Sequence, residues 1–301
     1  MTRSLHKLGT LLALTVLAST AQSAAVYSLS TRSSNSTLVR FDTANPGAVT
    51  TVGAISGATG LLDGIDFRPA DGALYGYNAT TSGIYRVDTN TGVTTLVSTS
   101  TTAIARNTAV GIDFNPAADR LRVVSAAENN LRINVASGAT LVDGTLVYAP
   151  GDVNAGVNPH ITEAAYTNND NNPATNTTLY YIDDFLNALV VTSNPNAGTL
   201  NTVGALGVDV DEFLGFDIFT SATGINTAFA SLRVAGASRL YTVNLVTGAA
   251  SLIGAIGLDR LNSLAVNPVP EPATLVLTAA AGLALLGLRR PKALPIKGLV
   301  A

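Results

Sequence analysis

Three aspartates occupy the same place in a repeated phrase, and their carboxylates are the strongest candidates for chemistry in this sequence. Asp66 lies in the phrase Gly-Ile-Asp-Phe that begins at Gly64, Asp113 lies in the same phrase beginning at Gly111, and Asp217 lies in the related phrase Gly-Phe-Asp-Ile. If the repeats pack around one axis, equivalent residues approach one another. A carboxylate held there needs hydrogen-bond donors or a cation, because burying it unpaired costs several kcal/mol.

Three interpretations of Asp66, Asp113 and Asp217 are open. In the first, which the repetition itself favours, each carboxylate accepts backbone N–H groups, or pairs with an arginine of the next repeat, and so locks neighbouring repeats together. In the second, the carboxylates bind calcium, which prefers hard oxygen ligands. In the third, they act as acid and as nucleophile or base on a glycoside. The third has little support from composition, since sugar sites need aromatic side chains and the chain has no Trp, nine Tyr and eight Phe.

Other polar residues give weaker signals. Asp209, Asp211 and Glu212 form an acidic cluster just before an expected strand, and they are secondary site candidates, although such a cluster is more typical of a solvated loop. His160 is the one histidine outside the N-terminal segment, and a lone histidine more often has a structural role. The absence of cysteine excludes disulfides, thiolate catalysis and cysteine-ligated metal sites.

The charge balance excludes one class of partner. Residues 24–268 contain 11 Arg, no Lys and 19 Asp plus Glu, a net charge of 11 − 19 = −8. An acidic body without lysine is a poor partner for phosphate backbones, so we expect no nucleic-acid binding. The abundance of Thr, Asn, Asp and Gly indicates turns and strands, and we expect an all-β fold.

The body of the chain consists of five repeats. The Gly-Ile-Asp-Phe phrase recurs, more faintly after its second copy, at positions 64, 111, 163, 215 and 263, so the spacings are 47, 52, 52 and 48 residues. A second element, a strand that runs into a glycine turn, also recurs five times. Punctuation by Gly, Pro and Asp divides one unit into four short strands over residues 62–68, 73–78, 84–88 and 93–97. Four strands in about 50 residues are typical of one propeller blade.

The order of the two elements predicts how the ring closes. Residues 25–55 hold an outer hairpin without an inner strand, and residues 261–267 hold an inner strand without an outer hairpin. Joined, they complete a fifth blade, which leaves no unpaired edge between the ends and needs no disulfide. We therefore predict a five-bladed β-propeller over residues 24–268, closed by N- and C-terminal strands. A β-sandwich and a six-bladed ring are the alternatives.

Both ends of the chain have the patterns of targeting segments. Residues 1–23 combine Arg3 and Lys7 with an apolar run over residues 8–18 and small residues before residue 24, which predicts an N-terminal signal helix that is cleaved. Residues 269–292 combine Pro270-Glu271-Pro272 with an uncharged segment over residues 273–288 and then Arg289-Arg290. This pattern predicts a C-terminal transmembrane helix, with a basic-apolar tail over residues 293–301 and the body outside the membrane.

Two resemblances follow from these residues. Pro270, Glu271 and Pro272, the apolar segment, Arg289 and Arg290 together resemble the PEP-CTERM sorting domain of exopolysaccharide-producing Gram-negative bacteria. This resemblance implies recognition by an exosortase and release to the cell envelope or matrix, while hydropathy alone also fits an ordinary membrane anchor. The Gly-Ile-Asp-Phe phrases and the Asp/Asn-Thr-Gly turns of the body resemble an uncharacterised secreted family, the domain of unknown function 4394, which carries no assigned activity.

These observations predict an exported, non-catalytic binding or matrix protein. It is inserted transiently in the inner membrane through its C-terminal helix, sorted by exosortase-type machinery, and presents loops of a rigid ring to an exopolysaccharide or an envelope protein. No cofactor is expected beyond a structural calcium ion at Asp66, Asp113 and Asp217. The alternative function is a glycan-acting hydrolase that uses the same three aspartates.

Overall fold

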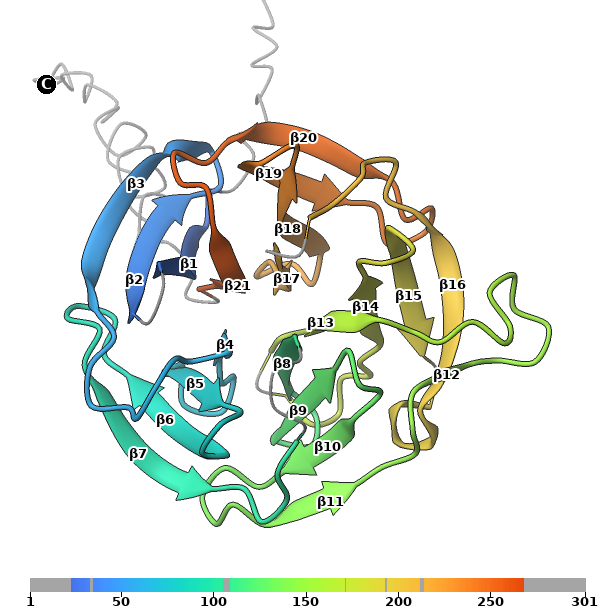
Figure 1. The fold of residues 1–301 in the computed structure, drawn as a ribbon, viewed down its shortest axis with the longest axis horizontal. Coiled ribbons are helices and arrows are strands. Elements are labelled where there is room, and N and C mark those ends of the chain that lie inside the picture. The colour runs from blue at the N-terminus through green and yellow to red at the C-terminus, as the bar shows by residue number, and fades with distance from the viewer. Residues whose placement is uncertain are drawn as a thin grey trace, which may run out of the picture.

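Five antiparallel sheets surround a central axis in the computed structural model of this protein (Figure 1). The structure describes residues 23–32, 35–104, 109–170, 172–192, 194–211 and 214–267. The prediction of an all-β, five-bladed propeller is confirmed. All but the last residue of the expected signal segment (residues 1–23), the sorting segment and tail (residues 269–301) and Glu212 lie outside the described residues.

Each blade has four antiparallel strands that lie one after another from the axis outward. Blade 4 carries a fifth strand, β12 (Val147–Tyr148), which pairs in parallel with β16. From the axis outward, the strands are β21 (Leu261–Val266), β1 (Ala25–Arg32), β2 (Asn35–Asp42) and β3 (Asn45–Ala54) in blade 1; β4 (Gly64–Phe67), β5 (Leu74–Asn78), β6 (Gly83–Val87) and β7 (Thr94–Thr99) in blade 2; β8 (Val110–Asn115), β9 (Arg120–Ser125), β10 (Asn130–Ile133) and β11 (Thr140–Val142) in blade 3; β13 (Ile161–Tyr166), β14 (Leu179–Asp183), β15 (Ala188–Thr192) and β16 (Thr199–Ala205) in blade 4; and β17 (Leu214–Thr220), β18 (Asn226–Val234), β19 (Ala237–Val243) and β20 (Ala250–Ala255) in blade 5.

The described part of the chain contains one short helix, the 3-10 turn η1 (Pro195–Ala197). No helix in these ranges has the length and apolar character needed to cross a membrane.

Blade 1 joins the two ends of the propeller. β21 pairs antiparallel with β1, with Val26 opposite Val266, and the Asn267 N–H donates to the Ala25 carbonyl oxygen at 2.8 Å. The predicted closure is therefore correct, with one difference: residues 25–54 form three strands instead of a hairpin. The C-terminal segment supplies only the innermost strand of blade 1, β21, so the N-terminal segment supplies the other three.

The closure also places both chain ends on one face of the ring. All five inner strands run in the same direction along the axis, so their last residues lie on the face that holds Ala24 and Asn267. We call this the terminal face and the opposite one the far face. The far face carries the residues that precede each inner strand and the turn between β14 and β15, because Asp183 at the end of β14 pairs with Ile161 at the start of β13.

The core fills the spaces between neighbouring blades. The inner strand β4 is buried along its whole length, as is β13, because each is covered on both faces. Between blades 1 and 2, for example, Tyr27 meets Phe67 edge to face, with ring centroids 5.6 Å apart. The outer strand β7 is mostly exposed.

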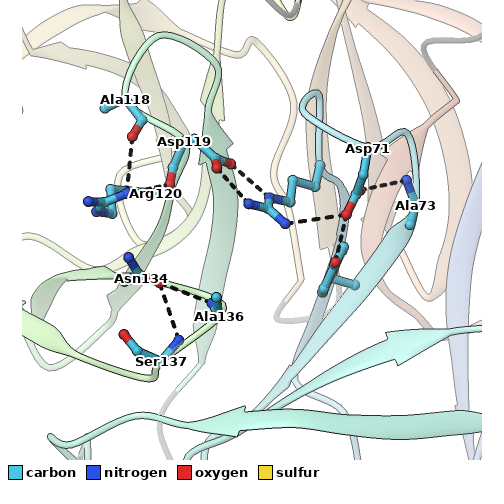
Figure 2. Close-up of polar contacts among 10 residues, drawn as sticks. Asp71, Ala73, Ala118, Asp119, Arg120, Asn134, Ala136 and Ser137 are labelled. Carbon is cyan, nitrogen blue, oxygen red and sulfur yellow. Dashed lines mark hydrogen bonds and ion pairs between the residues drawn. The ribbon is translucent and has the colours of Figure 1, made fainter.

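Asp and Asn recur at the turns because their side chains cap them (Figure 2). Oδ1 of Asn134 accepts the N–H groups of Ala136 and Ser137 at 3.0 and 3.2 Å, and this replaces hydrogen bonds that a turn cannot make by itself. An arginine also links two blades here. Arg68 at the end of β4 donates through Nε to Oδ1 of Asp119 in the β8–β9 turn at 2.7 Å.

The glycine turns form an outer ring of contacts. Four of the five glycines in the repeated strand–glycine turns, Gly92, Gly138, Gly198 and Gly248, have φ between +72° and +81°, a left-handed conformation that favours glycine. Each packs against the outermost part of the preceding blade, so a side chain there would collide with backbone. The pairs are Gly92 with Gly53, Gly138 with Thr99, Gly198 with Gly144 and Gly248 with Gly204.

Gly138→Ala should destabilise the protein strongly. The new Cβ would lie 1.9 Å from the Thr99 carbonyl oxygen, so the β10–β11 turn must move away from blade 2. Gly72→Ala is the matched control, because Gly72 also has a positive φ, +66°, but has no atom within 4 Å of the new Cβ. The control should cost about 1–2 kcal/mol from backbone conformation alone, and Gly138→Ala about 2 kcal/mol more. Urea unfolding measures both, and equal losses would contradict the contact.

Candidate functional site

The ring brings the three predicted aspartates together at the axis. Asp66 on β4, Asp113 on β8 and Asp217 on β17 each offer one carboxylate oxygen, and these three oxygens lie within 4.8 Å of one another. The residues are almost completely buried, with exposed fractions of 2%, 4% and 1%. The convergence follows from their equivalent positions on inner strands that surround one axis (Figure 1).

Each of these carboxylates also bonds to a neighbouring inner strand. The inner strand of a blade has a partner on its outer side only, so backbone N–H groups on its inner edge need other acceptors. In three of the junctions an aspartate supplies the acceptor to the next inner strand around the ring. The donors are Phe114 to Asp66 at 2.8 Å, Tyr166 to Asp113 at 3.1 Å and Val266 to Asp217 at 2.6 Å.

The other two junctions use different side chains for the same purpose. Glu163 on β13 accepts the backbone N–H of Phe216, and Oγ of Ser263 on β21 accepts the N–H of Ile65 at 2.9 Å. Sequence analysis missed both residues as members of the set. Both residues occupy the first position of the repeated phrase, which is glycine in Gly-Ile-Asp-Phe (the glycine place). In these two blades the third position of the phrase, where the others have aspartate, is alanine. A polar residue at the glycine place in the repeats that lack aspartate was the available signal.

Burial sets the protonation of the axial acids. It raises the pKa values of Asp66 and Asp113 well above their usual range, and repulsion between the axial carboxylates adds to this rise. Burial raises the pKa of Asp217 to about 7, even though the N–H groups of Val266 and Ile218 pull it down. Burial also raises the pKa of Glu163 well above its usual range. Without a compensating charge, the axis therefore favours protonated acids.

The three aspartates have the right chemistry to hold a cation. Calcium takes oxygen ligands at about 2.3–2.6 Å, so two ligands of one ion are separated by at most about 5 Å. The observed limit of 4.8 Å agrees with this requirement. Among the residues that the structure describes, this is the one group of three or more acidic or histidine side chains with such spacing. An all-carboxylate donor set suits calcium better than zinc.

The secondary acidic candidates do not converge. Oδ1 of Asp209 accepts from Nδ2 of Asn187 at 3.1 Å, while Oδ2 of Asp211 accepts from Nη1 of Arg233 at 3.0 Å. The two carboxylates are thus held by different strands and turns, and Glu212 lies outside the described residues.

His160 has a partner that sequence analysis did not find. Its Nδ1 lies 2.5 Å from Oδ1 of Asp184, and its ring centroid lies 5.6 Å from that of Phe185. The acid and the histidine are brought together because the start of β13 pairs with the end of β14. No spacing in the sequence indicates this contact, since it depends on the register of a hairpin with a long tip.

A cavity of about 580 Å³ lies beside blade 2 on the terminal face. Phe67, Leu74, Val87 and Asn267 are among its lining residues, and none of the three axial aspartates lines it. The carboxylates are therefore separate from this cavity.

Calcium is expected to raise the thermal midpoint of the protein, and a chelator should reverse the rise. At a calcium concentration of about 100 times Kd the stabilisation is about 2.7 kcal/mol. Asp113→Asn should abolish the response because it removes a charged ligand. Asp209→Asn, an exposed aspartate on the far face, should leave the response intact. A midpoint that is the same with calcium and with chelator would remove the calcium prediction.

Glu163→Gln should change how stability depends on pH. With chelator present, the raised pKa of Glu163 contributes stability below the unfolded value of about 4.3, and this contribution is lost as the pH rises through the folded value. Glutamine cannot ionise and loses no such contribution. As the pH rises, the free energy of unfolding of the variant minus that of wild type should therefore increase by up to about 1.4 kcal/mol per pH unit. Urea unfolding between pH 4 and pH 8 measures this gain.

Glu163→Ala controls for the hydrogen bond. Glutamine still accepts the Phe216 N–H, whereas alanine leaves it without this acceptor, so the alanine variant should lie about 1–3 kcal/mol below the glutamine variant at every pH. A wild-type minus glutamine difference that stays constant over the pH range would disprove the effect of burial on Glu163.

Several solved structures are similar to this chain at low identity. A structural genomics protein of unknown function from Bacteroides thetaiotaomicron VPI-5482 is 14% identical, with a TM-score of 0.46, over 69% of this chain and 53% of that one, so this chain spans about half of its length. A chain of a nidogen/laminin complex is 10% identical, with a TM-score of 0.45, over 81% and 98% of the two chains. A Bacteroides uniformis ATCC 8492 protein named "putative 6-phosphogluconolactonase" is 13% identical, with a TM-score of 0.40, over 79% and 83%.

Comparison with protein families gives a direct assignment. No curated protein matches the chain. The family described as "Domain of unknown function (DUF4394)" matches residues 37–265, which run from within β2 to within β21 and include all three axial aspartates. The chain therefore belongs to the family of the Domain of unknown function DUF4394.

Proposed function

We propose that this protein is an exported envelope or matrix protein that binds an extracellular glycan without hydrolysing it. One observation carries the non-catalytic part: all three axial aspartates accept backbone N–H groups from a neighbouring inner strand. Asp66 and Asp217 use both carboxylate oxygens as acceptors of backbone N–H groups. Carboxylates that hold the ring together are poorly placed to attack or protonate a substrate.

The geometry speaks against the hydrolase alternative in two further ways. A glycosidase needs its carboxyl groups beside an open pocket, and Asp66, Asp113 and Asp217 are buried and lie outside the 580 Å³ cavity. Such a site also needs an aromatic surface beside its carboxyl groups, and the one exposed Tyr or Phe among the described residues, Phe185, stands in the β14–β15 turn and not on an inner strand.

The proposed location rests on the sequence of the two ends. The signal pattern of residues 1–23 supports export, and the resemblance of residues 269–292 to a PEP-CTERM sorting domain supports transient anchoring in the inner membrane and exosortase-type sorting. The resemblance to a signal of exopolysaccharide-producing bacteria is also what supports a glycan as the partner. Since Ala24 and Asn267 share the terminal face, an anchored propeller directs its far face outward.

A glycan array combined with an activity screen tests this function. The full-length chain, kept in a detergent without a sugar headgroup, should bind at least one glycan and release no reducing sugar, and Asp66→Asn should bind equally well. Hydrolysis by wild type that is lost in Asp66→Asn would establish the hydrolase instead. Failure to bind any glycan would overturn the proposed partner.

A further inference from the structure

An unusual aromatic side chain marks the far face of blade 4. Phe185 is 81% exposed and stands in the turn between β14 and β15. The other described Tyr and Phe residues are buried or half-buried. A single exposed apolar residue needs no explanation by itself, so the surroundings of Phe185 decide whether it has a role.

The turn that carries Phe185 is tightly held. Oδ1 of Asp183 accepts the N–H of Leu186 at 3.0 Å, which closes the turn. Asn187, with φ of +50°, accepts the N–H of Leu206 through its carbonyl oxygen and the N–H of Val210 through its side chain, both at 2.8 Å. The aromatic ring is thus presented by a preformed loop, which lowers the entropy lost when a ligand binds.

A fixed histidine stands beside the ring. The imidazole of His160 is 40% exposed, and its centroid lies 5.6 Å from that of Phe185. Asp184, which is 9% exposed, accepts from Nδ1, and Asp183 accepts the backbone N–H of His160 at 3.0 Å. With Nδ1 engaged, Nε2 is the ring nitrogen that remains for a ligand.

We propose that Phe185 and His160 form a sugar-binding subsite, with Asp184 as the positioning residue. This inference rests on the proposed function and names its site. The Phe185 ring packs against the apolar C–H face of a pyranose, and Nε2 of His160 hydrogen-bonds to a ring hydroxyl beside it. Asp184 holds the imidazole in this orientation.

The charge around the subsite selects the class of glycan. Asp184 borders it, and Asp209 is bonded to Asn187 of the same turn. Even without the four buried axial acids, residues 24–268 carry 15 Asp plus Glu against 11 Arg. An acidic surface repels polymers of uronic acids. The ligand is therefore a neutral polysaccharide.

The size of the feature favours a sugar over a protein partner. A stable protein interface buries roughly 800 Å² on each side around an apolar centre. Here one aromatic ring is flanked by Asp184, His160 and Asn187, which are polar. One pyranose needs no more than one aromatic face and a few polar groups.

Affinity electrophoresis tests the subsite. The full-length chain runs through native gels that contain a neutral polysaccharide, a galactomannan or a β-glucan, or the anionic polygalacturonate. The neutral polymer should retard wild type, and Phe185→Ala should weaken the apparent affinity about tenfold or more. Phe185→Tyr should bind like wild type because it keeps the aromatic face. Val246→Ala is the matched control, since Val246 is 84% exposed in a turn on the terminal face, and it should bind like wild type.

The positioning role of Asp184 has its own readout. Asp184→Asn should reduce the affinity less than Phe185→Ala does, because the imidazole remains in the subsite. When His160→Ala is already present, adding Asp184→Asn should reduce the affinity no further. Thermal midpoints of the Phe185 and Val246 variants should match wild type within about 2 °C, since both side chains are exposed. The Asp184 side chain is 9% exposed, so the affinities of the His160 and Asp184 variants are compared at a temperature below their own midpoints.

The outcomes separate this inference from the proposed function. Retardation by a neutral glycan that Phe185→Ala leaves unchanged overturns the subsite but keeps glycan binding by the protein. Retardation by polygalacturonate alone overturns the charge argument and hence the proposed ligand. No retardation by any polymer, with no binding on a glycan array, overturns both.

Discussion

The backbone N–H groups on the inner edge of each blade determine how neighbouring blades are joined at the axis. An inner strand has a hydrogen-bonded partner strand on its outer side only. Its remaining donors must still be satisfied, because a buried unpaired N–H is costly. Asp66, Asp113 and Asp217, together with Glu163 and Ser263, supply the acceptors from the neighbouring inner strands. At four of the five junctions the acceptor is thus an acidic group, in a place where charge is unfavourable.

This requirement accounts for a feature that the axis shares with many active sites. Burial raises the pKa values of the three aspartates, and repulsion adds to the rise at Asp66 and Asp113, a property that is also common in catalytic acids. Here the same shifts follow from closing the ring with carboxylates. A proton or a cation can relieve the repulsion. At the outside of the ring, glycine turns make the corresponding contacts without any charge.

The sequence was sufficient for the architecture and for part of the site. Repetition near 50 residues and the order of its two elements predicted five blades, their closure and the equivalence of Asp66, Asp113 and Asp217. Glu163 and Ser263 were not recognised, because repeats are aligned by residue identity and these two perform the same task from another position. The contact between His160 and Asp184 could not be predicted either, since it depends on hairpin register and not on any local pattern.

The position of β21 determines when the ring can close during synthesis of the chain. Blade 1 lacks its innermost strand until Leu261–Val266 has been synthesised, so the ring stays open while about 260 residues leave the ribosome. Contacts between segments so distant in the chain form late and slowly. Closure of the ring by the last strand therefore waits until the whole domain has been synthesised.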